Sequence, residues 1–407
     1  MRRFFVQEAG TTAFRPRLVG AGTISLLLAA LGAFVVWCYL VAEEKTPLTW
    51  VVPIDLAIYQ KAGTEVSNGG LLYDAPYIYD LPFTYPPFSG VLFQGLAGLN
   101  DYALVSVWHG AIALVVLAVL LMVLRERGFR VGPVGIAIAL LFTLCLAGTE
   151  PLSGTFFFGQ INVFLMGLVA LDLIPRRLRL PGVGIGLAAG IKLTPAFMGL
   201  VLLIQRRWWA AVGSIVTFFI TVAIGFWGIR DAKDFWLDAM FDSSRVGEHL
   251  NPGAQSLKSV LIRFFDLDSS AVWGLAVLAT FALVCVAIYR AVKRENNTLA
   301  MCFAGIGACL ISPFSWFHHW VWVLPLGFAI LLGVNAQLGR RAHAWWQRQA
   351  VGAASVLAAV ATLAPFATLL VIPNMPSDFY TPAGLLILLA YVVYSFAVPT
   401  SSRAVGS

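Results

Sequence analysis

The chain has 407 residues, of which 59% are apolar and only 12% are charged. A soluble protein of this length needs more polar side chains to cover its surface, so the composition excludes a set of soluble domains and indicates a membrane protein. The formal net charge of +7 does not indicate nucleic-acid binding, because the basic residues occur in short clusters between apolar segments.

The first apolar run, from about residue 20 to 42, follows several arginines. It is too long for the core of a signal peptide and lacks a small-residue cleavage site, so it predicts an uncleaved first span. Further apolar runs cover roughly 102–124, 132–149, 154–174, 183–204, 208–229, 271–289, 298–312, 316–335, 349–372 and 382–399, with a shorter run at 87–99 that either dips into the membrane or begins the second span.

Clusters of Arg and Lys mark the cytoplasmic ends of spans. The clusters are Arg2, Arg3, Arg15 and Arg17; Arg125, Arg127 and Arg130; Arg176, Arg177 and Arg179; Arg206 and Arg207; Arg290, Lys293 and Arg294; and Arg340, Arg341 and Arg348. They alternate with the apolar runs everywhere except at 183–204, which has a cluster on both sides.

This exceptional run contains Lys192, and a Lys at the bilayer centre costs about 2.5–3.5 kcal/mol unless it faces protein or water. A helix that breaks near Lys192 and Pro195 and then returns resolves the conflict. We therefore expect an all-α, polytopic membrane protein with about 12 transmembrane helices or half-helices. It would form a single domain, residues 1–407, with both termini cytoplasmic and two structured outer loops, 43–86 and 230–270.

The sequence also excludes some functions. No GxxxxGK[ST] or GxGxxG motif occurs and the predicted inner connections are short, which excludes a pump driven by ATP. The five cysteines lie inside apolar runs without a CxxC pair or a His at ligand spacing. The sequence therefore predicts neither a zinc site nor a disulfide framework, and we expect no metal or other cofactor.

Asp55 is the first candidate for chemistry. It lies in the first outer loop between apolar residues and Pro53 on one side and apolar residues on the other. Such surroundings raise the pKa of a carboxyl group and make it a better proton acceptor, as a general base acting on a hydroxyl requires. The alternative is that Asp55 only caps a short amphipathic helix over residues 56–66.

Two further motifs lie on the predicted outer side. In the first, Tyr85 precedes two prolines, which impose either an extended entry into the membrane or a rigid turn with interfacial aromatic residues. In the second, Gln160 and Asn162 follow Phe158-Gly159, with Glu150 shortly before them. The two amides either bind sugar hydroxyls or hold helices together.

The segment Ser312-Pro-Phe-Ser-Trp316-Phe-His318-His319 carries two of the five histidines at the predicted outer end of a span. Adjacent residues on a helix point about 100° apart, which disfavours a shared metal ion. A His is suited to hold a phosphate or to transfer a proton. Packing at the membrane interface is the alternative.

The second outer loop contains acidic and basic candidates. Its four acids, Asp231, Asp234, Asp238 and Asp242, are spaced by three or four residues. This spacing predicts one face of a helix, and a solvated acidic face is favoured over a Ca²⁺ site because no EF-hand-like positions follow. Arg245 and Lys258 in the same loop are candidates to assist a phosphate.

Taken in order, these segments resemble glycosyltransferase family 87. The resemblance is carried by Asp55 in the first outer loop, Tyr85-Pro-Pro-Phe88, Phe158-Gly-Gln-Ile-Asn162, Gly190-Ile-Lys192-Leu-Thr-Pro195 followed by Arg206-Arg207-Trp208, and Ser312-Pro-Phe-Ser-Trp-Phe-His-His319. It implies a GT-C fold and a polyprenyl-phosphate-mannose-dependent α-1,2-mannosyltransferase of an actinobacterial plasma membrane, with a periplasmic active site. The most similar members add mannose to a phosphatidylinositol mannoside, and members that branch lipomannan are hard to separate from them.

The resemblance also implies roles for residues. Asp55 matches the family's acidic residue and would deprotonate the acceptor 2-hydroxyl, while His319 matches the residue near the donor phosphate. The candidate substrate-binding residues are Tyr85, Glu150, Gln160, Asn162, Lys192, Arg245, Lys258, Trp316 and His318. The expected partners are the lipid-linked donor, the mannolipid acceptor and the bilayer, with no nucleic acid.

The chemistry is consistent with this layout. Inversion at the donor's anomeric carbon needs one base opposite the leaving group, and one or two cations can stabilise a lipid phosphate as it leaves, without a metal. Two other functions stay open. The break at Lys192 is also typical of a secondary transporter or flippase, and another GT-C enzyme, such as an arabinosyltransferase, fits the same pattern.

Overall fold

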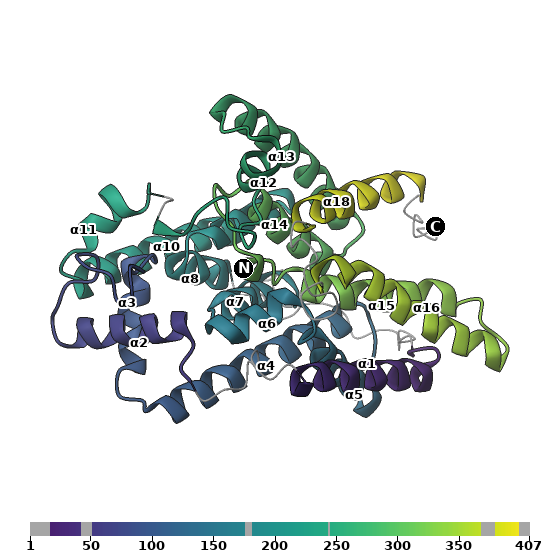
Figure 1. Cartoon of the computed structure of the whole chain (residues 1–407). Helices are drawn as coiled ribbons and strands as arrows, with labels where there is room; N and C mark the ends of the chain where they lie inside the picture. The colour runs from purple at the N-terminus through teal and green to yellow at the C-terminus, as the bar shows by residue number, and fades with distance from the viewer. Residues whose placement is uncertain (1–16, 42–50, 176–180, 243–244, 368–378, 399–407) are drawn as a thin grey trace, which may run out of the picture.

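The computed structural model describes residues 17–41, 51–175, 181–242, 245–367 and 379–398. The described chain is helical, and its β-structure is limited to two isolated bridges, Ile78–Leu81 and Ala254–Trp316. Arg2, Arg3, Arg15, Lys45, the cluster at 176–179 and Arg403 lie outside the described residues, as do parts of the predicted runs and of the first loop. The prediction of an all-α protein is confirmed (Figure 1).

Six helices of the described chain are long and apolar enough to cross a membrane. They are α1 (Ala21–Val41), α4 (Asp101–Glu126), α10 (Trp208–Gly228), α13 (Ser270–Lys293), α16 (Trp345–Leu363) and α18 (Tyr380–Ala397). A helix satisfies all its backbone hydrogen bonds internally, so an unbroken apolar run of about 20 residues is stable in lipid. The chain is therefore a multi-pass membrane protein.

A shorter helix, α14 (Asn297–Ile311), lies at the centre of the bundle, and all but one of its residues are buried. Its small residues permit close packing: a Cβ at Gly305 would meet the ring of Trp322, and one at Gly307 would meet Val284. Small residues of this kind are typical of helix contacts in membranes. Around α14 lie α7 (Asn162–Leu173), α13 and α15 (Val323–Gly339).

The apolar run at 154–174 forms two helices, where a single span was expected. Its first part belongs to α6 (Glu150–Phe158), whose axis is bent by 73° from that of the preceding α5 (Pro133–Leu146), and its second part is α7 (Asn162–Leu173). Helix α6 ends at Gly159, which has φ +70°. This left-handed conformation favours glycine and ends the helix. The chain then turns into α7, which places Gln160 in a bend between two helices.

The predicted break at Lys192 is confirmed. Helix α8 (Val183–Ile191) ends there, and Lys192 has the extended angles φ −149° and ψ 131°. A 3₁₀ turn, η2 (Thr194–Met198), and a short helix, α9 (Gly199–Ile204), follow. Pro195 lies at the start of η2 and has no backbone N–H to continue the helical ladder.

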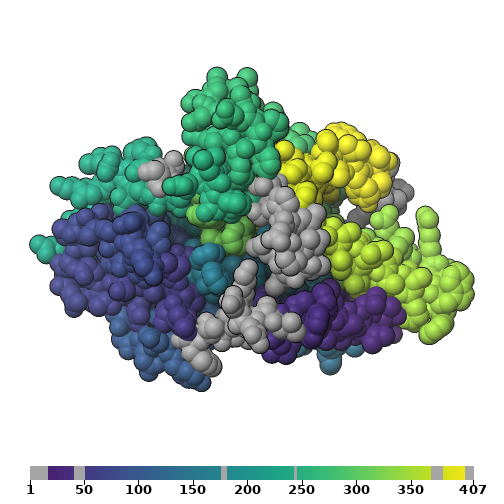
Figure 2. Space-filling view, viewed as in Figure 1, coloured from purple at the N-terminus to yellow at the C-terminus, as the bar shows by residue number. Residues whose placement is uncertain are grey.

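The two loop regions contact each other. In the first, residues 51–86, helix α2 (Ile54–Ser67) lies against α3 (Pro87–Phe93), where a Cβ at Gly63 would collide with the carbonyl of Phe93. Helix α3 is a separate short helix, because α4 has its own N-cap in Asn100. Figures 1 and 2 show α2 and α3 at the end of the molecule opposite α16.

The second loop region, residues 230–269, joins the first through Asp231. The Asp231 carboxylate is buried and accepts hydrogen bonds from the backbone N–H groups of Leu72 and Tyr73 at 2.8 and 2.7 Å. The prediction of a solvated acidic helix face is therefore wrong at this position. The helix there is also irregular, with a short α11 (Ala232–Asp234) followed by a π-turn, η3 (Phe235–Ala239).

Candidate active site

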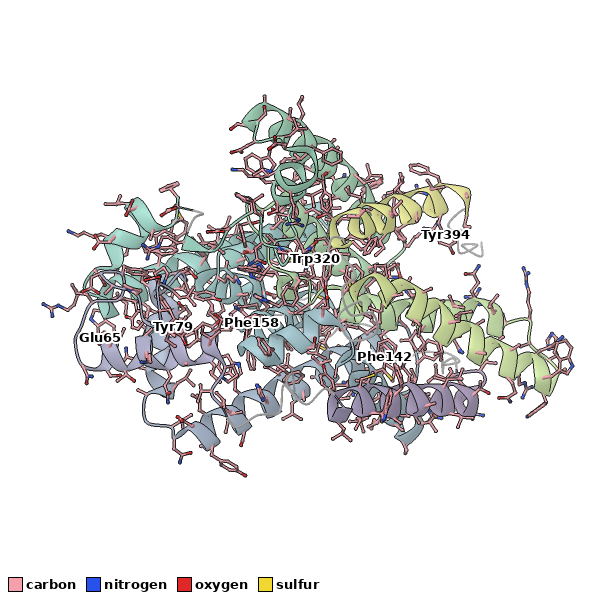
Figure 3. The ribbon with its side chains drawn as sticks, in the orientation of Figure 1. Glu65, Tyr79, Phe142, Phe158, Trp320 and Tyr394 are labelled. Carbon is pink, nitrogen blue, oxygen red and sulfur yellow. The ribbon has the colours of Figure 1, made fainter. Side chains whose placement is uncertain are left out.

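A cavity of about 280 Å³ lies where the two loop regions meet the bend before α7, the break after α8 and the segment 312–319. In Figure 3, Phe158 and Trp320 lie near the middle of the molecule and mark the segments that lead to Gln160 and His319. The polar or aromatic residues that line the cavity include Asp55, Tyr59, Tyr85, Gln160, Lys192, Asp242, Arg245, Trp316 and His319. The structure thus brings together most of the residues predicted for the site.

Asp55 lies in the first turn of α2, outside the membrane-spanning helices. The N-cap of α2 is Pro53 and no side chain caps the helix, so the interpretation of Asp55 as a cap is wrong. Its Oδ2 instead accepts a hydrogen bond from Gln160 Nε2 at 2.6 Å. Burial raises the pKa of Asp55 to about 6, against the opposing effects of the Gln160 bond and the Lys192 charge. Such a carboxylate is ionised at neutral pH and is suited to accept a proton.

Gln160 and Asn162 join the two sides of the cavity. The Asn162 Nδ2 donates to Gln160 Oε1 at 3.2 Å and to the His318 carbonyl at 3.1 Å. The Asn162 Oδ1 accepts from Lys192 Nζ at 3.0 Å. The Tyr85 hydroxyl also donates to Gln160 Oε1, at 3.3 Å. Gln160 lines the cavity, whereas Asn162 is buried behind it.

His319 lies in a 3₁₀ turn, η5 (Phe317–His319), before α15. Its Nδ1 faces the backbone N–H of Trp316 at 3.2 Å, and this N–H can only donate. Nδ1 is therefore the acceptor, and neutral His319 carries its proton on Nε2. Burial, and then the charge of Lys192 and the neighbouring His318, lowers the pKa of His319 well below its ordinary value, which keeps the ring neutral.

The protonated Nε2 of His319 lies 3.1 Å from Lys192 Nζ. When Lys192 is charged, both nitrogens are hydrogen-bond donors, so neither can satisfy the other. An anionic oxygen that accepts from both nitrogens would satisfy the pair, and such charge-assisted bonds are strong. The pair is therefore suited to a phosphate oxygen.

Trp316 anchors the second loop region to this segment. Its indole Nε1 donates to the Val246 carbonyl at 3.0 Å, and a Cβ at Gly247 or Gly253 would collide with its ring. Arg245, next to Val246, lines the cavity, and its Nε and Nη2 have no hydrogen-bond partner among the described residues. Arg245 is thus a second cation available to an anionic ligand.

Four candidate residues do not line the cavity: Asn162, which lies behind it, and Glu150, Lys258 and His318. Glu150 is buried at the start of α6 and accepts a hydrogen bond from the Tyr380 hydroxyl at 2.5 Å. The Lys258 ammonium lies 5.8 Å from the ring centre of Trp273. The ring of His318 is buried against aromatic neighbours, including Phe158 at 5.2 Å.

Tyr59 and Asp242 also line the cavity, although neither was predicted as a catalytic or substrate-binding residue. Tyr59 lies one helical turn after Asp55, so its position on the same face of α2 could have been predicted. Its hydroxyl lies 2.9 Å from that of Tyr85. No comparable signal distinguished Asp242 from the other acids of its loop. Within the described ranges, no group of three His, Cys, Asp or Glu side chains is placed to hold a metal ion.

Comparison with known proteins agrees with this geometry. The model of glycosyltransferase family 87 matches residues 83–313. A polyprenol-phosphate-mannose-dependent α-(1-2)-phosphatidylinositol pentamannoside mannosyltransferase of Mycolicibacterium smegmatis is 32% identical over 332 aligned positions, and the match covers 79% of this chain and 78% of the relative. A polyprenol-phosphate-mannose-dependent α-(1-2)-phosphatidylinositol mannoside mannosyltransferase of Mycobacterium tuberculosis is 32% identical over 341 aligned positions, and the match covers 74% of this chain and 78% of the relative.

No solved structure shows a significant match to the chain. The family match nevertheless covers more than half of the sequence and includes the bend at Gln160 and the break at Lys192. The resemblance predicted from the motifs is confirmed, and the chain belongs to glycosyltransferase family 87.

Proposed function

We propose that this glycosyltransferase transfers mannose from polyprenyl-phosphate-mannose to the 2-hydroxyl of a mannose on a phosphatidylinositol mannoside, with inversion and formation of an α-1,2 linkage. The names of the relatives support this donor and acceptor class. The observation that carries the proposal is the meeting of the Asp55 carboxylate with the Lys192–His319 pair in one cavity.

The residues suit the two sides of the reaction. Asp55 accepts the proton of the acceptor hydroxyl as its oxygen attacks the anomeric carbon of the donor. The bond from this carbon to the phosphate oxygen breaks, and its electron pair leaves with the lipid phosphate. Lys192, the Nε2–H of His319 and Arg245 stabilise the negative charge on that phosphate.

The membrane setting fits a lipid-linked donor. Each buried methylene of a polyprenyl chain contributes about 0.8 kcal/mol, so the donor stays in the bilayer and must reach the site from the side. In our proposal the whole chain, residues 1–407, forms one domain with about 12 crossings or half-crossings. Both termini are cytoplasmic and the two loop regions lie on the periplasmic face, because basic clusters favour the cytoplasmic side.

The test is transfer by the purified full-length protein in detergent, with polyprenyl-phosphate-mannose and a phosphatidylinositol mannoside. Asp55→Asn should lower turnover by roughly 10²–10⁴, the usual contribution of a general base. Asp101→Asn is a matched control, because Asp101 is exposed at the start of α4, and it should leave the rate unchanged.

Two results would contradict the proposal. The first is the wild-type rate in the Asp55→Asn variant, which would show that no base acts at this position. The second is the absence of elongated product from the wild-type protein, since a transporter makes none. For the donor side, His319→Ala should lower kcat/KM for the donor more than His319→Gln, because Gln keeps an N–H donor on its side chain.

A further inference from the structure

A continuous chain of hydrogen bonds connects the phosphate side of the cavity to Asp55. It runs from Lys192 Nζ to Asn162 Oδ1 at 3.0 Å, from Asn162 Nδ2 to Gln160 Oε1 at 3.2 Å, and from Gln160 Nε2 to Asp55 Oδ2 at 2.6 Å. The two amides join residues that are far apart in sequence, since Gln160 and Asp55 are separated by 105 positions. We call these four residues the amide relay.

The polarity of the amide relay is fixed by groups that have only one role. The Lys192 amine donates, so the Asn162 atom facing it is the oxygen, and the His318 carbonyl only accepts, so the Asn162 atom facing it is the nitrogen. Asn162 must therefore present an N–H to Gln160. Gln160 in turn receives this bond on its oxygen, together with one from the Tyr85 hydroxyl, and its NH₂ group points to Asp55.

We propose that Asn162 and Gln160 are positioning residues that orient the Asp55 carboxylate and stabilise its ionised form, rather than ligands of the sugar. This inference rests on the proposed function, in which Asp55 is the base. Asn162 supports it most directly, because it is buried, does not line the cavity, and has protein partners on both polar atoms.

The relay leaves one oxygen of Asp55 for the acceptor hydroxyl. Oδ2 is held by Gln160, whereas Oδ1 has no hydrogen-bond partner among the described residues. A carboxylate that is held through one oxygen has its second oxygen in a fixed direction. The reacting oxygen is then already oriented before the acceptor binds. The relay also links Asp55 to Lys192, so the positions of the base and of the phosphate-side cation are coupled.

The titratable or charged groups that share the cavity with Asp55 are Tyr59, Tyr85, Lys192, Asp242, Arg245 and His319. A test must therefore avoid adding a charge of its own. Asn162→Leu and Gln160→Leu both remove relay bonds without changing the charge. Asn335→Leu is the matched control. Asn335 lies on α15 and is also a buried Asn, which forms hydrogen bonds with the backbone of Val19 and with the side chain of Ser355.

The experiment measures kcat and acceptor KM between pH 4.5 and 8.5 for the purified full-length protein and the three variants, with thermal unfolding as a folding check. Loss of the Gln160 N–H removes a bond to the ionised carboxylate, so the pH at which activity falls on the acid side should rise by about one unit in Gln160→Leu. Asn162→Leu should shift it in the same direction by less, and should lower kcat by about tenfold with acceptor KM changed less than threefold. Asn335→Leu should lower stability without changing the pH at which activity falls on the acid side, which we call the acid limb.

The outcomes separate the interpretations. A raised acceptor KM with an unmoved acid limb would mean that the amides bind the sugar, and an equal shift in Asn335→Leu would mean general destabilisation; either result overturns the relay. If Asn162→Leu does not fold, the pH profile of Gln160→Leu decides the question. An acid limb of Gln160→Leu that stays at the wild-type pH would then also overturn the proposal. A wild-type protein that makes no product would contradict the proposed function itself, which the variants cannot do.

Discussion

At the scale of single residues, the chemistry of the site depends on bonds to groups with one fixed role. The Trp316 backbone N–H determines which nitrogen of His319 is protonated, and the His318 carbonyl determines how the Asn162 amide is turned. Backbone groups cannot exchange donor and acceptor roles, whereas side-chain amides and imidazoles can. The backbone of the segment 316–318 therefore decides the polarity of side chains that the sequence presents only as residue types.

Asp55 also affects stability, and the sign follows from its pKa. Burial raises this pKa from 3.8 to about 6. Between these two values the folded protein holds a proton that the unfolded chain releases, so the folded state loses stability as the pH rises through this range. Above about pH 6 the carboxyl group is ionised in both states, and the free energy of unfolding is lowered by the full cost of burying the charge.

We therefore expect Asp55→Asn to raise the unfolding temperature at pH 7.5 and to change it little at pH 4, where the native carboxyl is already neutral. Thermal unfolding of the detergent-solubilised protein at both values measures this, with Asp101→Asn as the control. An unfolding temperature that drops at pH 7.5 would mean that the carboxylate stabilises the fold, contrary to the direction of its pKa.

Part of the residue-level site could be predicted and part could not. Asp55 and Lys192 were identified because each is an ionisable group in an apolar context, which is costly without a function, and His319 was identified from the family resemblance. The bond between Gln160 and Asp55 could not be predicted, because it joins two segments whose relative position depends on packing across the bundle. Glu150 illustrates the same limit, since its partner Tyr380 is 230 positions away.

At the scale of elements, two helices are capped by carboxylates from other segments. Glu126, at the end of α4, accepts from the backbone N–H groups of Asn297 and Thr298 at the start of α14. Asp172, at the end of α7, accepts from the backbone N–H groups of Gly182 and Ile185 at the start of α8. Each carboxylate accepts hydrogen bonds from N–H groups that have no partner within the helix, and its negative charge interacts favourably with the positive end of the helix dipole.

Glu126→Gln should lower the free energy of unfolding by about 1–3 kcal/mol, because the amide offers one acceptor where the carboxylate offers two and brings an N–H donor toward backbone N–H groups. Turnover per folded molecule should not change, since Glu126 does not line the cavity. Thermal or denaturant unfolding, with the exposed Glu248→Gln as control, measures the difference. Equal stability of the two variants would show that the cap contributes nothing.

The elements differed in how well the sequence predicted them. The break at Lys192 could be predicted, because a charge and a proline interrupt an apolar run with basic clusters on both sides. The helix end at Gly159 could not, since it lies inside a long and largely apolar run and a single glycine is tolerated inside many helices. Asp231 was assigned to a solvated face by its spacing, but spacing does not reveal that the first loop packs over this position.

At the scale of the whole molecule, the site is built from segments between Asp55 and His319 that meet in one cavity. Lys192 enters the cavity from the broken helix, while Asp55 and Arg245 come from the two loop regions. In our proposal the cavity faces the periplasm. The distribution of basic clusters favours this orientation, because Arg and Lys are retained on the cytoplasmic side.

The orientation can be tested with single cysteines in intact cells. Glu248 lies in the second loop region and Arg341 lies between α15 and α16, and both are exposed. A membrane-impermeant thiol reagent should label the Glu248→Cys protein in intact cells and the Arg341→Cys protein only after permeabilisation. The native cysteines, none of which is exposed, provide the background in the unsubstituted protein. The reverse labelling pattern would place the Asp55 cavity in the cytoplasm. The positive-inside rule would then have to fail both at Arg340 and Arg341 and at the basic end of α13.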